Sequence, residues 1–306
     1  MIKKIVPVFL YILMGANSFA QDSTVLVGKK IVTLSEVVLN NKLNVPAFID
    51  RIKNDTTFYK AFRNLRILNY SSINDVRMLD KNDNSRASLF SKTKQIRDSN
   101  CRRMEVLEEQ SSGDFYTGDH QYNYYTAQMY ASLFFTNGAV GGEDNIVAGS
   151  SFSTAGKSGL EKHKEQLKML FFNPGKKIKG LPFISNKTSI YDDDMADVDD
   201  MSVDMDEYNK TSCYILKQKV KPGKEANVVV DEMTTWFDDK TFEVVARNYT
   251  LSYDADVYDF KVQMEVQMTH ADNYLVPALI RYNGNWKAIF KKRERGVFTA
   301  TLFDFK

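Results

Sequence analysis

Hydrophobic and polar residues alternate with a period of two over the last third of the chain. The clearest stretch, Phe260–Met268, reads FKVQMEVQM. In a β-strand this alternation places apolar side chains on one face and polar side chains on the other. Similar patterns, separated by turn residues, predict six more strands: 213–220, 227–237, 242–253, 274–282, 286–294 and 297–305. Among these turns, Asn283-Gly284 has the chemistry of a two-residue hairpin.

The first half of the chain mixes helical and strand patterns. Phe58, Phe62 and Leu65 share one face at helical spacing, and Pro46 suits the first turn of a shorter helix. Residues 69–109 read as an antiparallel meander, 124–136 as a helix, and Ser158 begins another helix. Seven C-terminal strands without intervening helices exclude a parallel α/β sheet. The sequence therefore predicts one α+β domain over residues 21–306: a large curved antiparallel sheet or open half-barrel, with helices covering its concave face.

Two segments do not fit this periodicity. Residues 137–157 are rich in glycine and serine and predict a flexible loop. Residues 192–207 contain nine acidic residues out of sixteen and no basic one, which indicates a solvated acidic loop. A calcium site is the alternative, although the spacing does not fit an EF-hand. A basic group near the C-terminus consists of Lys287, Lys291, Lys292, Arg293 and Arg295. These side chains could pair with the acidic segment, lie on the solvent-exposed face of a sheet, or contact anionic lipid headgroups.

The N-terminus has the pattern of a secretory signal peptide. Lys3 and Lys4 precede an apolar run of about a dozen residues, too short for a membrane span of roughly 20 residues. Ser18 and Ala20 then place small residues at the −3 and −1 positions of a cleavage site. We therefore expect residues 1–20 to be removed on export, which leaves a mature chain without a transmembrane span.

Charge and cysteine content narrow the possible partners. Residues 1–20 hold two lysines and no acid, so the mature chain has 39 basic and 39 acidic residues. A nucleic-acid binder needs a basic surplus, so nucleic acid is not an expected partner. Cys101 and Cys213 are the only cysteines. In an oxidising compartment the two cysteines either form a disulfide or remain two separate buried thiols. A disulfide would add about 4–5 kcal/mol to the free energy of unfolding, because it lowers the entropy of the unfolded chain.

No motif for catalysis or cofactor binding stands out. The chain lacks the serine-hydrolase, zinc-protease, P-loop and dinucleotide-binding signatures. Its three histidines, His120, His163 and His270, lie far apart in different kinds of segment. We therefore predict no catalytic residues, no metal ligands and no cofactor, and a non-enzymatic role.

The aromatic and methionine side chains suggest a different kind of site. Such flexible apolar groups adapt to irregular acyl chains, although an ordinary core of sheet and helix would use them as well. If a cavity exists, we expect these residues to line it: Phe134, Phe135, Trp236, Phe260, Val262, Met264, Val266 and Met268.

Residues Cys213–Asp239 carry a family resemblance. This stretch runs strand, turn, strand and ends in Trp-Phe-Asp-Asp. With the signal peptide, the N-terminal helices and the long meander, it resembles the lipoprotein-localisation carriers of the Gram-negative envelope, the LolA/LolB type. The chain also looks like a member of a family of exported envelope proteins with the same half-barrel. The resemblance implies an open half-barrel whose helix-covered concave face holds lipid acyl chains.

Three functions remain open. The preferred one is a periplasmic or envelope binding module for a lipid or lipoprotein acyl chain. The second is a structural or interaction protein of the envelope, with a solid core and a protein partner. The third is an enzyme whose site is dispersed along the chain and shows no motif.

Overall fold

We describe the protein from a computed structural model, over residues 23–141, 169–177, 187–254, 258–288 and 292–306. The predicted signal peptide, most of the predicted glycine-rich loop and most of the helix predicted from Ser158 lie outside the described residues. So does Lys291 of the basic group. No described helix has both the length and the apolar character needed to cross a membrane.

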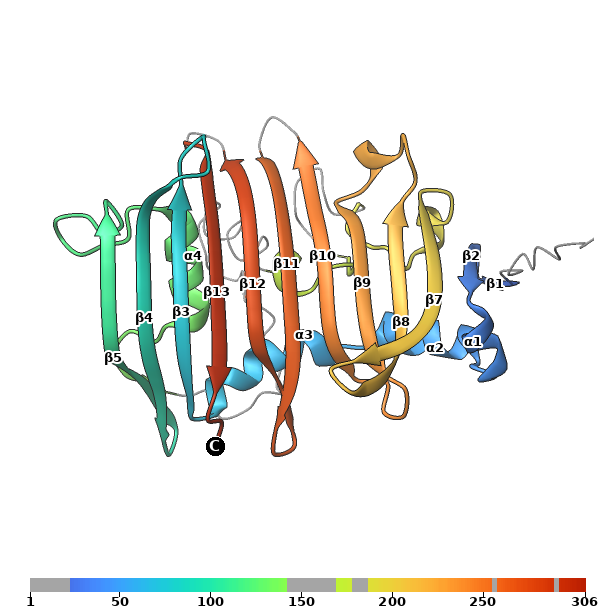
Figure 1. The fold of residues 1–306 in the computed structure, drawn as a ribbon, viewed down its shortest axis with the longest axis horizontal. Helices are drawn as coiled ribbons and strands as arrows, with labels where there is room; N and C mark the ends of the chain where they lie inside the picture. The colour runs from blue at the N-terminus through green and yellow to red at the C-terminus, as the bar shows by residue number, and fades with distance from the viewer. Residues whose placement is uncertain (1–22, 142–168, 178–186, 255–257, 289–291) are drawn as a thin grey trace, which may run out of the picture.

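Thirteen strands form one sheet in the described part of the chain (Figure 1). In chain order they are β1 (Ser23–Val27), β2 (Lys30–Leu34), β3 (Tyr70–Leu79), β4 (Ser85–Asp98), β5 (Cys101–Gly113), β6 (Val140–Gly141), β7 (Asp199–Tyr208), β8 (Thr211–Val220), β9 (Val230–Asp238), β10 (Val244–Asp254), β11 (Tyr258–Ala271), β12 (Tyr274–Ala288) and β13 (Glu294–Phe303). The helices are α1 (Glu36–Asn40), α2 (Val45–Asn54), α3 (Thr57–Asn64) and α4 (Tyr125–Phe134), with short 3-10 turns η1 (Leu65–Ile67), η2 (Asp193–Met195) and η3 (Glu225–Asn227).

The spatial order of the strands is β1-β2-β7-β8-β9-β10-β11-β12-β13-β3-β4-β5-β6. All neighbouring strands are antiparallel except β2 and β7, which run parallel. The last strand, β13, pairs with β3, so the C-terminal meander continues directly into the N-terminal one. β1 and β6 do not pair with each other, and the sheet therefore stays open. The predicted large antiparallel sheet is confirmed in this coarser form.

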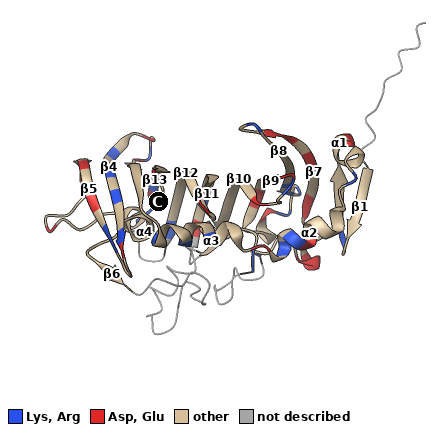
Figure 2. Ribbon diagram, turned by 90° about the horizontal axis from the view of Figure 1, so that it is seen from below, with Lys and Arg blue, Asp and Glu red and all other residues tan. Residues whose placement is uncertain are grey.

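The two faces of the sheet differ in what covers them. Helices α2, α3 and α4 lie on one face (Figure 2), together with the buried segment Leu170–Phe172. In β11, Phe260, Val262, Met264 and Val266 are buried, whereas the residues between them are exposed. The predicted alternation of β11 is therefore confirmed, and its apolar side belongs to the main core.

The second half of the acidic segment is not a loop. From Asp199 onward it forms β7, between β2 and β8. The prediction failed because acid content obscured the period of two, which places Met201 and Val203 in the core. Lys217 Nζ of β8 lies 3.7 Å from Asp204 Oδ2. Among the described residues, no ion pair joins the acidic segment to the basic group.

The predicted turn at Asn283-Gly284 is also wrong. β12 continues through both residues, which pair with Val297 and Gly296 of β13. A side chain at position 284 would place its Cβ 1.9 Å from the hydroxyl oxygen of Tyr282. Glycine stands here because the backbone must make room for that buried tyrosine, which is a requirement of packing and not of turn geometry.

Cys101 and Cys213 are both free in the structure. Cys101 begins β5 and Cys213 lies in β8, with seven strands between them. Neighbouring strands are about 4.8 Å apart, so the two cysteines lie several times farther apart than a disulfide can span. The possible disulfide is excluded within one chain. Burial raises the pKa of the Cys213 thiol to about 11, whereas Cys101 is exposed.

We expect the native protein to react with a thiol reagent at one cysteine, Cys101, and the denatured protein at two. Cys213 is protected because it is buried and its reactive thiolate is disfavoured. Ellman titration with and without guanidinium measures both numbers. Zero reactive thiols in non-reduced, denatured protein would contradict the separation of the two strands.

One buried ion pair attaches the N-terminal hairpin to the sheet. Lys30 Nζ lies 2.5 Å from Asp199 Oδ1 and donates to the carbonyl oxygen of Met195 at 3.0 Å. Both side chains of the pair are almost fully buried. Burial raises the pKa of Asp199 although the Lys30 ammonium acts in the opposite direction. The pair fixes the register of the parallel β2–β7 contact because each charge requires the other.

Replacing Lys30 by methionine should lower the free energy of unfolding by about 3–5 kcal/mol, because Asp199 would be left as an uncompensated buried charge. Urea unfolding measures the change. Lys29→Met is the matched control, since the side chain of Lys29 is exposed. An equal, small effect of both substitutions would show that the pair does not hold the hairpin. Replacing Asp199 by leucine in the Lys30→Met background should restore much of the loss.

Candidate functional site

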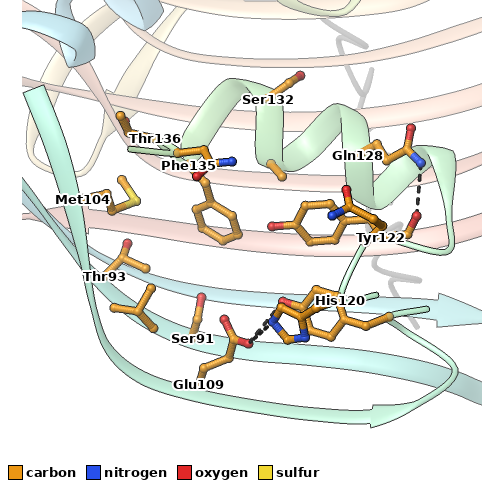
Figure 3. A pocket seen from close by; sticks show the side chains of 15 residues that line it. Ser91, Thr93, Met104, Glu109, His120, Tyr122, Gln128, Ser132, Phe135 and Thr136 are labelled. Atoms are coloured by element: carbon orange, nitrogen blue, oxygen red, sulfur yellow. Dashed lines mark hydrogen bonds and ion pairs between the residues drawn. The ribbon is translucent and has the colours of Figure 1, made fainter. Parts of the chain in front are cut away.

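A cavity of about 700 Å³ lies between helix α4 and the end of the sheet formed by β4 and β5 (Figure 3). Among the described residues, β6 pairs with only the first two residues of β5, next to this cavity. We call this cavity the groove. Its lining comes from β4, β5, the 114–124 connection and α4: Ser91, Thr93, Met104, Val106, Glu109, Tyr116, His120, Gln121, Tyr122, Gln128, Ala131, Ser132, Phe135, Thr136 and Asn137.

Helix α4, which forms one wall, is held at its N-terminus by a residue from another element. Tyr124 at the N-cap provides no capping side chain. Instead, the Glu294 carboxylate of β13 accepts hydrogen bonds from the backbone amides of Tyr125 at 2.9 Å and Thr126 at 2.8 Å. It also accepts one from the Thr126 hydroxyl, which in turn accepts one from the indole of Trp286. A carboxylate at this end is favoured by both the free amides and the helix dipole.

The inner side of α4 rests on a buried polar network. The Tyr130 hydroxyl donates to Asn74 Oδ1 at 2.6 Å, and the Asn74 amide donates to the hydroxyls of Ser72 and Ser91. Ser72 is itself paired with Thr93 at 2.7 Å. Such a network specifies one position for the helix because each partner would be unsatisfied if the helix moved.

The same network explains why a groove exists beside α4. The inward positions of β4 change from Ala87 and Leu89 to Ser91 and Thr93, which are short and polar. Short side chains leave space between the strand and the helix, and Phe135 closes only one side of it (Figure 3). The groove therefore has a polar floor and a wall with apolar side chains from Met104, Val106, Ala131 and Phe135.

One end of the groove contains a carboxylate surrounded by aromatic rings. The Tyr116 hydroxyl donates to Glu109 Oε1 at 3.2 Å, and His120 Nε2 lies 4.0 Å from the same oxygen. The rings of Tyr116 and His120 stack with centroids 4.1 Å apart, and the Tyr122 ring lies 5.3 Å from that of Tyr116. Burial, followed by the proximity of Tyr122 and Glu109, raises the pKa of Tyr116, so its hydroxyl remains a donor at neutral pH.

The groove is better suited to binding than to covalent chemistry. Its serine hydroxyls are engaged: Ser91 accepts from Asn74, and Ser132 donates to the Met129 carbonyl. Neither is paired with His120, which a nucleophilic mechanism would require. Among the residues that the structure describes, no group of three or more His, Cys, Asp or Glu residues could hold a metal ion.

A second hollow, of about 460 Å³, lies on the other face of the sheet, over β3 and β11–β13. Its charged side chains pair with each other, Arg77 with Asp75 at 2.6 Å and Arg281 with Glu265 at 3.1 Å. Because these charges compensate each other, the second hollow offers a ligand less unpaired charge than the groove does.

Most of the predicted lining residues do not meet at the groove. Phe135 lines it, whereas Phe134 is buried against Tyr130 and Phe172. The β11 residues Phe260, Val262, Met264 and Val266 are buried in the core, Met268 is partly buried there, and the Phe171 ring packs on Phe260. Trp236 points to the opposite face from its buried neighbour Phe237 and packs on Tyr208.

Sequence reasoning missed the groove floor and the aromatic end. A signal for the floor was present, because SKTKQ in β4 is polar at both inward and outward positions. The aromatic end comes from the connection 114–124, whose three tyrosines and one histidine gave no periodic pattern. Only the fold brings that connection next to Glu109.

Three solved structures match most of this chain at low sequence identity. They are a DUF1329 family protein from Desulfovibrio piger (11% identity, covering 82% of this chain and 93% of that one, TM-score 0.24), a putative outer membrane lipoprotein-sorting protein domain from Vibrio parahaemolyticus (8%, 80% and 88%, 0.25) and a LolA superfamily protein from Nitrosomonas europaea (8%, 82% and 91%, 0.23). No protein-family model and no curated protein matches the sequence. Two of the three are lipoprotein-sorting or LolA superfamily proteins, the type that the sequence resembles, but at these identities and TM-scores the likeness carries no argument about fold, ligand or activity.

Replacing Glu294 by alanine should destabilise the protein by about 1 kcal/mol and selectively loosen the first turn of α4, because two backbone amides lose their acceptor. Hydrogen exchange at Tyr125 and Thr126 measures the local effect. Glu294→Gln should lie between wild type and alanine, since it keeps an acceptor without the charge. Thr301→Ala, an exposed position on β13, is the control; equal exchange in all variants would contradict the cap.

Proposed function

We propose that this protein is an exported binding module of the periplasm or cell envelope that holds an amphiphilic ligand, such as a lipid or a lipoprotein acyl chain, in the groove. The observation that carries the proposal is the groove itself: about 700 Å³, beside α4, with apolar side chains on one wall and polar groups on its floor. Its volume lies within the usual range for small-molecule sites. Export follows from the predicted signal peptide.

The binding energy would come from the apolar wall. An alkyl chain lying along Met104, Ala131 and Phe135 gains about 0.8 kcal/mol for each methylene removed from water. Since the groove is not an enclosed cavity, a ligand can enter and leave without separating the helix from the sheet. The predicted β11 lining is not part of this proposal, because Phe171 and Tyr282 already pack beside it.

The open ends of the sheet favour a second candidate, an interaction protein of the envelope. Leu26 and Ile31 face each other across the β1–β2 hairpin and are about two-thirds exposed. At the other end, Val106 and Leu107 of β5 are similarly exposed. Exposed apolar side chains on strand edges are typical of surfaces that pair with other chains.

We expect the mature protein to bind the uncharged probe N-phenyl-1-naphthylamine saturably, with a rise in probe fluorescence. Ser132→Trp should weaken that binding at least about tenfold, because the exposed Ser132 lines the groove and a large ring would fill it. Lys94→Trp is the matched control, since Lys94 is exposed and lies between the inward-facing Thr93 and Gln95 of β4. Equal binding by both variants would place the site elsewhere; absence of binding by the wild type would favour the second candidate.

A further inference from the structure

We propose that the groove selects amphiphiles with a positively charged ammonium head and seats that head against Glu109, Tyr116 and Tyr122. This inference rests on the proposed function, and it names the ligand class that the same site would take.

The lining of the groove favours a cation. Among the fifteen lining residues that the structure describes, Glu109 is the only one that carries a carboxylate, and none is a lysine or an arginine. A carboxylate or phosphate head would meet Glu109 without a compensating cation, whereas an ammonium head would complete an ion pair.

The hydrogen-bonding capacity of the Glu109 carboxylate is only partly satisfied. Its side chain is 32% exposed, and Oε1 accepts from Tyr116. Within the part of the chain that the structure describes, Oε2 has no hydrogen-bond partner, and no lysine or arginine forms an ion pair with either oxygen. The carboxylate thus retains acceptor capacity on the groove side.

Aromatic rings lie around the Glu109 carboxylate. Tyr116 and His120 stack together, and Tyr122 lies beside Tyr116 and reaches into the groove (Figure 3). Aromatic faces attract cations, most strongly where water is partly excluded. A carboxylate combined with tyrosine rings is a recognised arrangement for binding quaternary and primary ammonium groups.

The neighbouring carboxylate provides a control within the same strand. Glu108 points to the opposite face of β5, where it pairs with Lys92 at 2.7 Å. It has the same chemistry and nearly the same position in the chain as Glu109, but it faces away from the groove. Charge effects that are not specific to the groove should therefore appear equally at both positions.

Calorimetry with three ten-carbon amphiphiles below their critical micelle concentrations tests the inference: decyltrimethylammonium, decanoate and the uncharged decyl glucoside. We expect the ammonium probe to bind at least about tenfold more tightly than decanoate. Glu109→Gln should weaken ammonium binding about tenfold and leave glucoside binding unchanged, whereas Glu108→Gln should change neither. Tyr116→Leu should weaken ammonium binding about fivefold, and Tyr116→Phe, which keeps the ring, should restore most of it.

The outcomes separate the two proposals. If none of the three probes binds, the proposed function fails. If the glucoside binds but the ammonium probe binds no better than decanoate, or if Glu109→Gln and Glu108→Gln behave alike, the ammonium inference fails and the groove remains a binding site. Tetramethylammonium, which lacks the alkyl chain, should bind at least about a hundredfold more weakly than decyltrimethylammonium. Equal binding of the two would contradict an amphiphilic ligand and would indicate that the groove binds a small soluble amine.

Discussion

The apolar face of a single open sheet is the constraint on which the rest of this structure depends. Thirteen strands present one face rich in large apolar side chains, and few helices are available to cover it. Removing that face from water requires α2, α3, α4 and the segment around Phe171 to pack on it together. Each contact that holds a helix on the sheet is then important for stability, because the layer that covers the apolar face is thin.

The attachments differ from one end of the sheet to the other. At the β1 end, a buried ion pair joins Lys30 to Asp199. In the centre, aromatic contacts dominate, such as Phe62 on Phe172 and Phe171 on Phe260. At the β5 end, hydrogen bonds hold α4, through Glu294 at its start and Tyr130 on its inner side. The sheet under this helix also carries the short polar side chains of Ser91 and Thr93, and a groove remains beside α4.

This difference links stability to the proposed function. A fully apolar floor under α4 would favour close packing and would leave no space for a ligand. The short side chains of Ser91 and Thr93 avoid that collapse, and their hydrogen bonds keep the polar groups satisfied. The helix stays in place without filling the space next to it.

The sequence by itself determined the antiparallel sheet, the α3 and α4 helices and the buried face of β11, because these depend on local periodicity. It was wrong for β7 and for Gly284, where residue type suggested a loop and a turn. Neighbouring strands decided both: β2 and β8 hold the acidic segment in the sheet, and the Tyr282 hydroxyl requires the glycine. Only the tertiary structure could separate Cys101 from Cys213, turn Trp236 away from the core and bring Tyr116 and His120 to Glu109. These contacts and separations involve residues from different elements. The order of the strands in the sheet sets the distances between such residues, and the hydrophobic periodicity of a single strand does not encode that order.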